Sequence, residues 1–324
     1  MANDWTLEDF TQIRKRHRGA YKPELKDIPF ELSRGKVETF IKCPRCFRME
    51  KVGDVKPPGM PGFLLNTNTD TLLKKDHDQY RGKEPHPLMV KAGLEHLIPF
   101  EHEDMEKWEQ SVHFGLTPNH FNTLHRESNI LFGGGLDDVW QNKETGELHI
   151  VDYKSTSQPS KEPKPLDETF LAPPDDPKKP DYKASYRRQM DMYQWIARRK
   201  GFNVSNTGYF LYVDGLHNGI DGMIDKNDPA LAWMKFDAAI IPFEGDDSWI
   251  EPTLMEIKEK LEEIVCVETP DGVKASEDAM RKLSHSPDCE DGKYLLANSQ
   301  YHDRGLTSIR RSAIIVNEDL KKVT

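Results

Sequence analysis

The sequence has no apolar run long enough to cross a membrane as a helix, which takes about 18 consecutive apolar residues. The first 22 residues, MANDWTLEDFTQIRKRHRGAYK, lack the apolar core of a signal peptide. Only four of the 324 residues are cysteines, which is typical of a chain that keeps its thiols reduced. These absences predict a cytoplasmic protein with no membrane partner.

Other common signals are missing too. No G-x-S-x-G motif is present, so an α/β-hydrolase with a Ser-His-Asp triad has little support. There is no internal repeat and no long low-complexity tract. With 36% hydrophobic and 31% charged residues, the 324 residues suit one large globular domain or two modest ones.

Positive charge is scarce overall but is concentrated locally. The formal net charge is −10, and residues 244–291 alone hold 15 acidic against 5 basic residues. By contrast, residues 33–51 carry six Lys/Arg against two Glu, and residues 183–200 carry six against one Asp. A phosphate backbone needs a local positive surface rather than a basic total, so a nucleic-acid partner stays possible. Solvated helix faces explain the same stretches equally well.

The pattern of apolar and turn residues predicts a mixed α/β or α+β fold, with helices on a short sheet. The expected helices are 33–50, capped by Ser33, then 66–81, 182–200 and 248–265, and the expected strands are 129–141, 148–156, 204–215, 233–245 and 307–319. Strands 129–141 and 148–156 form a hairpin, and the apolar run HIVDY indicates a strand covered on both faces.

Three regions are expected along the chain. Residues 1–128 form a helical region that contributes to the main domain, and residues 129–243 form its core. Within that core, residues 158–181 hold seven prolines and ten charged residues, which predicts a long loop or flap. Residues 244–324 form an acidic helix and an irregular extension.

The hairpin carries polar side chains that a sheet core does not need. Alternation along the second strand puts Asp152 and Lys154 on one face, and the hairpin brings Asp137 of the first strand within reach of the same point. Two carboxylates and a backbone carbonyl suit a hard cation such as Mg²⁺ or Mn²⁺, and a lysine beside it can orient or deprotonate a water or stabilise charge. A plain surface Asp–Lys pair is the simpler alternative.

A second pair of polar residues lies on the helix at 182–200. Gln189 and Tyr193 are four residues apart and share one face beside Arg187 and Arg188. An amide and a phenol on that face can hold a nucleic-acid strand next to the cation. The alternative is a core-facing tyrosine with a bystander glutamine.

Three motifs follow one another in order: G-x-h-D-x-h at 134–139, h-h-D-x-K at 150–154 and Q-x-x-x-Y at 189–193, with h apolar. Together they resemble the PD-(D/E)xK nuclease superfamily, in particular its RecB-like branch, which includes the CRISPR-adaptation exonucleases. The stretch FIKCPRCFRM is similar to a C-P-R-x-F/Y segment of that branch. The resemblance covers about residues 33–213 and implies a restriction-endonuclease-like core.

The resemblance also implies a role for each matching residue. Asp137, Asp152 and the Tyr153 carbonyl would bind the metal, and Lys154 would be the catalytic lysine. Gln189 and Tyr193 would orient the substrate or that lysine. Asp138 falls at a variable motif position and is the less favoured ligand. Many members carry a metal-binding histidine on an earlier helix, and Asp70 stands at that place here, with His77 two turns further on.

The four cysteines depart from the family pattern. Many members hold an iron–sulfur cluster with one early and three late cysteines, whereas two are early and two late here, and Gly292 stands where another late cysteine is expected. Cys43, Cys46, Cys266 and Cys289 can still form a four-thiolate site for an iron–sulfur cluster or zinc. A lone C-x-x-C with reduced, unliganded thiols is the alternative.

Two functions remain in view. The first is a Mg²⁺- or Mn²⁺-dependent deoxyribonuclease acting on single strands or ends, in DNA repair, recombination, or CRISPR and mobile-element processing. The second is a nuclease-fold protein that binds nucleic acid or a protein partner without cleavage, the partner docking on the acidic region 244–291. An unrelated hydrolase with a chance motif match is a third possibility.

Overall fold

The computed structural model describes residues 5, 6, 8–10, 16, 17, 19–56, 62–110, 117–158, 163–263, 285, 286 and 289–294. The chain divides into two compact units. The first comprises Met1–Arg16, Ile28–Arg34 and Met60–Met255, and the second comprises His17–Asp27, Gly35–Gly59 and Glu256–Thr324. Helices occur in both units, and the two sheets of the described residues lie in the first unit. The predicted mixed α/β fold class is confirmed at that level.

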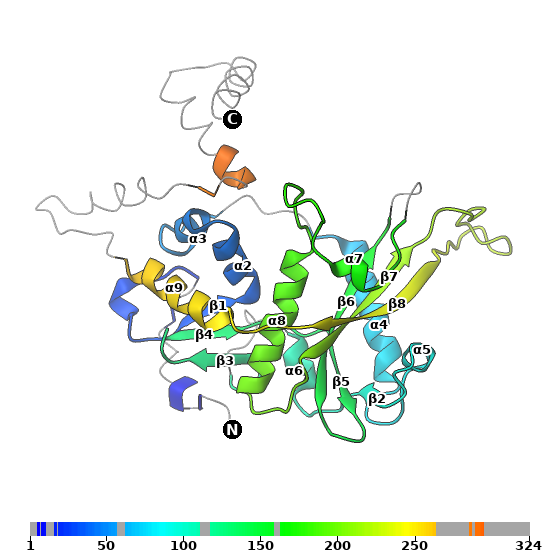
Figure 1. The fold of residues 1–324 in the computed structure, drawn as a ribbon, viewed down its shortest axis with the longest axis horizontal. Coiled ribbons are helices and arrows are strands. Elements are labelled where there is room, and N and C mark those ends of the chain that lie inside the picture. The colour runs from blue at the N-terminus through cyan, green and yellow to red at the C-terminus, as the bar shows by residue number, and fades with distance from the viewer. Residues whose placement is uncertain are drawn as a thin grey trace, which may run out of the picture. The chain divides into compact units, whose positions relative to one another are not determined.

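A five-stranded sheet in the first unit has the order β2-β5-β6-β7-β8 (Figure 1). Its strands are β2 Leu97–Pro99, β5 Asp138–Asn142, β6 Leu148–Thr156, β7 Thr207–Gly215 and β8 Phe236–Glu244. All neighbours are antiparallel except β6 and β7. A parallel pair needs a crossover, and helix α8 (Ala184–Arg199) lies between these two strands in the chain.

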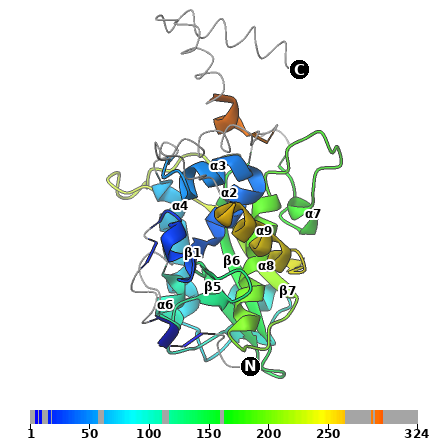
Figure 2. The ribbon, with the colours of Figure 1, turned by 90° about the vertical axis from the view of Figure 1, so that its left-hand side faces the viewer.

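Strand β6 is covered on both faces, as its apolar run predicts. Every residue from Leu148 to Tyr153 is buried. Val151 and Tyr153 pack in a core with Met89 of α5 (Pro87–Lys91) and Leu73 of α4 (Leu64–Asp78). Asp152 faces the other way, toward α8. Figure 1 and Figure 2 both place α4 and α8 on opposite sides of β6.

The predicted strand 129–141 is wrong as a single element. It is two strands in different sheets, β4 (Ile130–Gly133) and β5. Strand β4 lies between β1 (Phe30–Ser33) and β3 (Asn122–His125) in a three-stranded sheet. The chain changes sheets at Gly134 and Gly135, where it passes close to other atoms: a Cβ on Gly135 would lie 2.9 Å from the Glu109 carbonyl oxygen.

The predicted helix 33–50 is also wrong as a single element. Ser33 is the last residue of β1, and two helices follow, α2 (Arg34–Lys42) and α3 (Pro44–Lys51). Pro44 forces the break because it lacks an N–H and disfavours helical backbone in the residue before it. Cys43 is accordingly extended, with φ −159° and ψ 99°.

The other predicted elements agree with the structure to within a few residues. Helices α4, α8 and α9 (Ile250–Glu262) match the expected helices, and β6, β7 and β8 match the expected strands. Short helices α6 (Met105–Glu109) and α7 (Glu168–Leu171) were not predicted, and α7 lies in the segment expected to be loop. The strand expected at 307–319 lies outside the described residues. No helix in the described part of the chain is long and apolar enough to span a membrane.

We expect Leu211→Ala in β7 to lower the free energy of unfolding by about 2–5 kcal/mol, because its side chain is fully buried in the core against β6. The matched control is Leu231→Ala, since Leu231 is 48% exposed and its truncation leaves no cavity. Urea unfolding of both variants measures the difference. Equal losses would contradict the assignment of this core.

Candidate active site and metal centre

Asp138 is a fully buried carboxylate, and both of its oxygens accept hydrogen bonds from other groups of the protein. Oδ1 accepts hydrogen bonds from Arg81 Nη1 at 2.9 Å and from the Val139 N–H at 2.8 Å. Oδ2 accepts from the Tyr153 hydroxyl at 2.7 Å and from Trp140 Nε1 at 3.2 Å. Asp138 thus makes structural hydrogen bonds to three parts of the first unit.

Asp137 is the acid that remains available at the start of β5. It is half-buried, and its Oδ2 accepts the N–H of Tyr153 at 2.9 Å. This bond ties the carboxylate to the middle of β6. Asp137 also lies within hydrogen-bonding reach of the Asp152 carboxyl group. The hairpin therefore brings together the two acids that the sequence singled out.

Asp152 is buried, and its two oxygens have different partners. Oδ1 accepts a hydrogen bond of 2.6 Å from Gln189 Nε2, and Oδ2 forms an ion pair with Lys154. Burial raises the pKa of Asp152 to about 7, and Asp137 adds to the rise while Lys154 opposes it. Near neutral pH, a cation that approaches Oδ2 competes with both a proton and Lys154.

Lys154 holds its charge despite burial. Desolvation lowers its pKa, but the carboxylates of Asp152 and Asp137 outweigh that effect and raise the pKa above its ordinary value. Its Nζ also donates to the Tyr153 carbonyl oxygen at 3.2 Å and lies 5.1 Å from the centre of the Tyr186 ring. The ammonium thus contacts the carboxylate and the carbonyl that are the expected metal ligands.

Helix α8 supplies the amide and the phenol to the same place. Gln189 donates to Asp152, and its own Oε1 is buried with no hydrogen-bond partner in the described part of the chain. Tyr193 packs against Gly134, where a Cβ would lie 2.7 Å from the tyrosine ring. Burial raises the pKa of Tyr193, so the hydroxyl stays protonated, and it forms a hydrogen bond with Arg34.

Asp70 approaches the site from α4. It is half-buried, and burial followed by the charge of Asp137 raises its pKa from 3.8 to about 6, while Lys154 and Lys74 act in the opposite direction. The neighbouring candidate, His77, is buried elsewhere in α4. Its ring stacks on His86 at 4.3 Å, and its Nδ1 lies 2.9 Å from the Leu73 carbonyl oxygen. Asp70 thus interacts electrostatically with Asp137 and Lys154, whereas His77 contacts His86 and its own helix.

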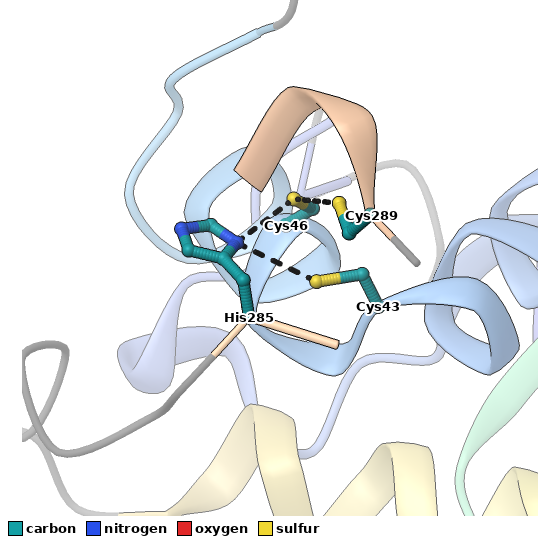
Figure 3. Close-up of side chains that lie close together, drawn as sticks. All are labelled: Cys43, Cys46, His285 and Cys289. Carbon is teal, nitrogen blue, oxygen red and sulfur yellow. Dashed lines mark hydrogen bonds between the residues drawn. The ribbon is translucent and has the colours of Figure 1, made fainter. Parts of the chain in front are cut away.

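Three of the four cysteines come together in the second unit, with a histidine that the sequence analysis missed (Figure 3). The ligand atoms of Cys43, Cys46, His285 and Cys289 all lie within 4.8 Å of one another. His285 Nδ1 lies 3.6 Å from Cys43 Sγ and 3.4 Å from Cys46 Sγ, and Cys46 Sγ lies 3.4 Å from Cys289 Sγ.

This group can hold a metal ion. Among the residues that the structure describes, it is the group of cysteine, histidine and acidic side chains gathered tightly enough to do so, and the carboxylates of the hairpin form no comparable closed set. Cys266 lies outside the described residues. The spacing H-x-x-x-C at 285–289 resembles the second half of many zinc sites and was the available signal for His285.

No protein-family model matches the sequence, and comparisons with curated proteins and with solved structures found no match either. The likeness to PD-(D/E)xK nucleases therefore depends on the three motifs and on the geometry of the residues that carry them.

The two adjacent acids should respond differently to mutation. Asp138→Asn should lower the free energy of unfolding by about 3 kcal/mol or more, because Arg81 loses its buried anionic partner. Asp137→Asn should cost about 1 kcal/mol or less, since it removes one charge from a half-buried site. Urea unfolding distinguishes them, and a larger loss for Asp137→Asn would contradict these roles.

The raised pKa of Asp70 predicts a pH dependence. Because folding favours its protonated form, the wild-type protein should lose stability relative to Asp70→Asn as the pH rises from about 4 through about 6. At pH 8 the variant should be more stable by roughly 1 kcal/mol after solvent screening, with little difference at pH 4. Urea unfolding at both pH values is the measurement. A pH-independent difference would show that Asp70 titrates normally.

Proposed function

We propose that the protein is a metal-dependent nuclease of the PD-(D/E)xK type that hydrolyses phosphodiester bonds of DNA. The observation that carries the proposal is the convergence of Asp137, Asp152, Lys154 and Gln189 at one end of the β5–β6 hairpin. The order of elements, with β6 joined to a parallel β7 through α8, supports a restriction-endonuclease-like core.

The chemistry of the donor set fits Mg²⁺ or Mn²⁺. Asp137, Asp152 and the Tyr153 carbonyl would hold the ion, with Asp70 close enough to contribute from α4. When bound, such an ion supplies a Lewis acid and lowers the pKa of a water. The high pKa of Asp152 indicates a carboxylate that lacks sufficient positive charge in the metal-free protein, and a divalent cation would provide it.

Lys154 would act as a cation rather than as a base. Its raised pKa keeps the ammonium protonated beside the two carboxylates. The Lys154 ammonium would donate to a phosphate oxygen and stabilise its developing negative charge. Gln189 would then keep the Asp152 carboxylate oriented through its 2.6 Å hydrogen bond.

The basic stretch 183–200 contributes less to a DNA surface than its charge suggests. Arg187 is paired with Asp181, and Arg198 is paired with Asp247. Lys200 donates to the carbonyl oxygens of Pro118 at 2.8 Å and His120 at 3.0 Å. These cations stabilise the fold, so the proposal depends on the hairpin site and not on this stretch.

We expect Lys154→Ala to reduce cleavage of end-labelled DNA by at least about 100-fold, because the ammonium is the cation that faces the reacting phosphate. The assay uses single- and double-stranded DNA with Mg²⁺, Mn²⁺ or EDTA. The matched control, Lys143→Ala, removes an exposed lysine from the turn of the same hairpin and should cleave normally.

Cleavage that persists in Lys154→Ala would refute the assignment of the site. A folded wild-type protein that binds DNA but does not cut it with either metal would favour the second function, a nuclease fold that binds without cleavage. Retained binding by Lys154→Ala together with lost cutting would support the nuclease.

A further inference from the structure

We propose that Cys43, Cys46, His285 and Cys289 bind one Zn²⁺ ion in a closed structural site. This site would fasten His285 and the segment 289–294 to the junction of α2 and α3, and it would hold no iron–sulfur cluster. The inference concerns the second unit only and does not depend on the proposed nuclease activity. It also replaces the expected four-thiolate set, because His285 takes the place assigned to Cys266.

The spacing of the ligand atoms is that of a single-ion shell. Zinc binds sulfur at about 2.3 Å and nitrogen at about 2.0–2.1 Å, so a tetrahedral site has edges of about 3.8 Å between sulfurs and about 3.6 Å between sulfur and nitrogen. The structure has Cys46 Sγ 3.4 Å from Cys289 Sγ. His285 Nδ1 lies 3.6 Å and 3.4 Å from the sulfurs of Cys43 and Cys46. These three distances are close to the edges of a tetrahedral shell around a single ion, and all the ligand atoms lie within 4.8 Å of one another.

Backbone N–H groups support the sulfurs. The N–H groups of Cys46 and Ser286 donate to Cys43 Sγ. The N–H of Gly292 donates to Cys289 Sγ at 3.2 Å. Such bonds stabilise the thiolate form that binds metal, and they fix the direction of each ligand. Cys43 precedes α3 with an extended backbone, and Cys46 lies in the first turn of that helix.

Gly292 makes room for the histidine. A Cβ at this position would lie 2.4 Å from His285 Cγ and 2.6 Å from its Nδ1, so any larger residue would push the ring away from the sulfurs. The position at which the family pattern led us to expect a cysteine therefore has a different use here. Its lack of a side chain lets the imidazole pack against the backbone there.

The ligand set also argues against an iron–sulfur cluster. Clusters are held by thiolates arranged around two or four irons, which separates the sulfurs more widely than a single ion does. Three sulfurs and one imidazole in a tetrahedral arrangement are instead a known structural zinc combination, with no position left for a substrate or water. A cavity of about 320 Å³ is lined by all three cysteines.

Zinc content is the direct test. The full chain should contain about one zinc and negligible iron after purification without air, measured by inductively coupled plasma mass spectrometry. Cys289→Ser and His285→Ala should lose the zinc, and His285→Cys should retain it. Cys266→Ser is the matched control and should also retain it, whereas a four-thiolate site would lose its metal in this variant.

A second variant tests the geometry without touching a ligand. Gly292→Ala keeps all four ligands and should bind zinc about 10- to 100-fold more weakly in a chelator competition, because the His285 ring is displaced. Zinc-edge X-ray absorption of the wild-type protein should give three sulfurs and one nitrogen around the metal.

Several results would overturn the proposal. They are stoichiometric iron with visible charge-transfer absorption, loss of metal in Cys266→Ser, or a wild-type chain that takes up no zinc from a buffered zinc solution. Unchanged zinc affinity in both His285→Ala and Gly292→Ala would also refute it. If Cys289→Ser fails to fold, zinc uptake by Gly292→Ala and Cys266→Ser decides the question.

Discussion

The buried carboxylate of Asp138 is the interaction on which the candidate active site depends. It accepts hydrogen bonds from β5, from β6 through Tyr153, and from Arg81 just after α4. A buried charge is costly unless all its lone pairs are satisfied, so these donors lock the three elements in one arrangement. That arrangement directs Asp137 toward β6 and leaves it available for a ligand. Asp138 thus stabilises the scaffold, and its neighbour Asp137 is left available in the candidate site.

The hairpin site holds charge that the fold alone does not require. Asp152 is buried with a raised pKa, and Lys154 stays protonated beside it. Apolar side chains of similar size in place of Asp152 and Lys154 would cost less free energy to bury. Perturbed groups that converge in this way are common at functional sites, and here they converge where two carboxylates and a carbonyl suit a hard cation. The second unit offers soft ligands instead, in the cysteine–histidine group that can hold a metal ion.

Local patterns in the sequence were sufficient for much of this fold. Strand β6 has an apolar run that only a doubly covered strand tolerates, and α8 has apolar residues at helical spacing, so both were predicted nearly to their ends. The segments at 33–50 and 129–141 were each predicted as one element and are two. The first is broken by Pro44, a local signal that helical spacing outweighed. The second is broken because the chain changes sheets after Gly133, at Gly134, which packs closely against Tyr193.

The sequence by itself determined which residues are candidates for a functional site: the D-x-K of β6, the acid before β5, the Gln–Tyr pair of α8 and the early C-x-x-C. Spacing along one strand or helix dictates which side chains share a face, so these assignments needed no tertiary contact. Only the tertiary structure decided that Asp138 is structural and that Asp70 comes near Asp137. It alone brought His285 to the cysteines, across 239 residues from Cys46. Such contacts depend on how elements that are distant in the sequence pack together. The spacing of residues within a single helix or strand does not predict this packing.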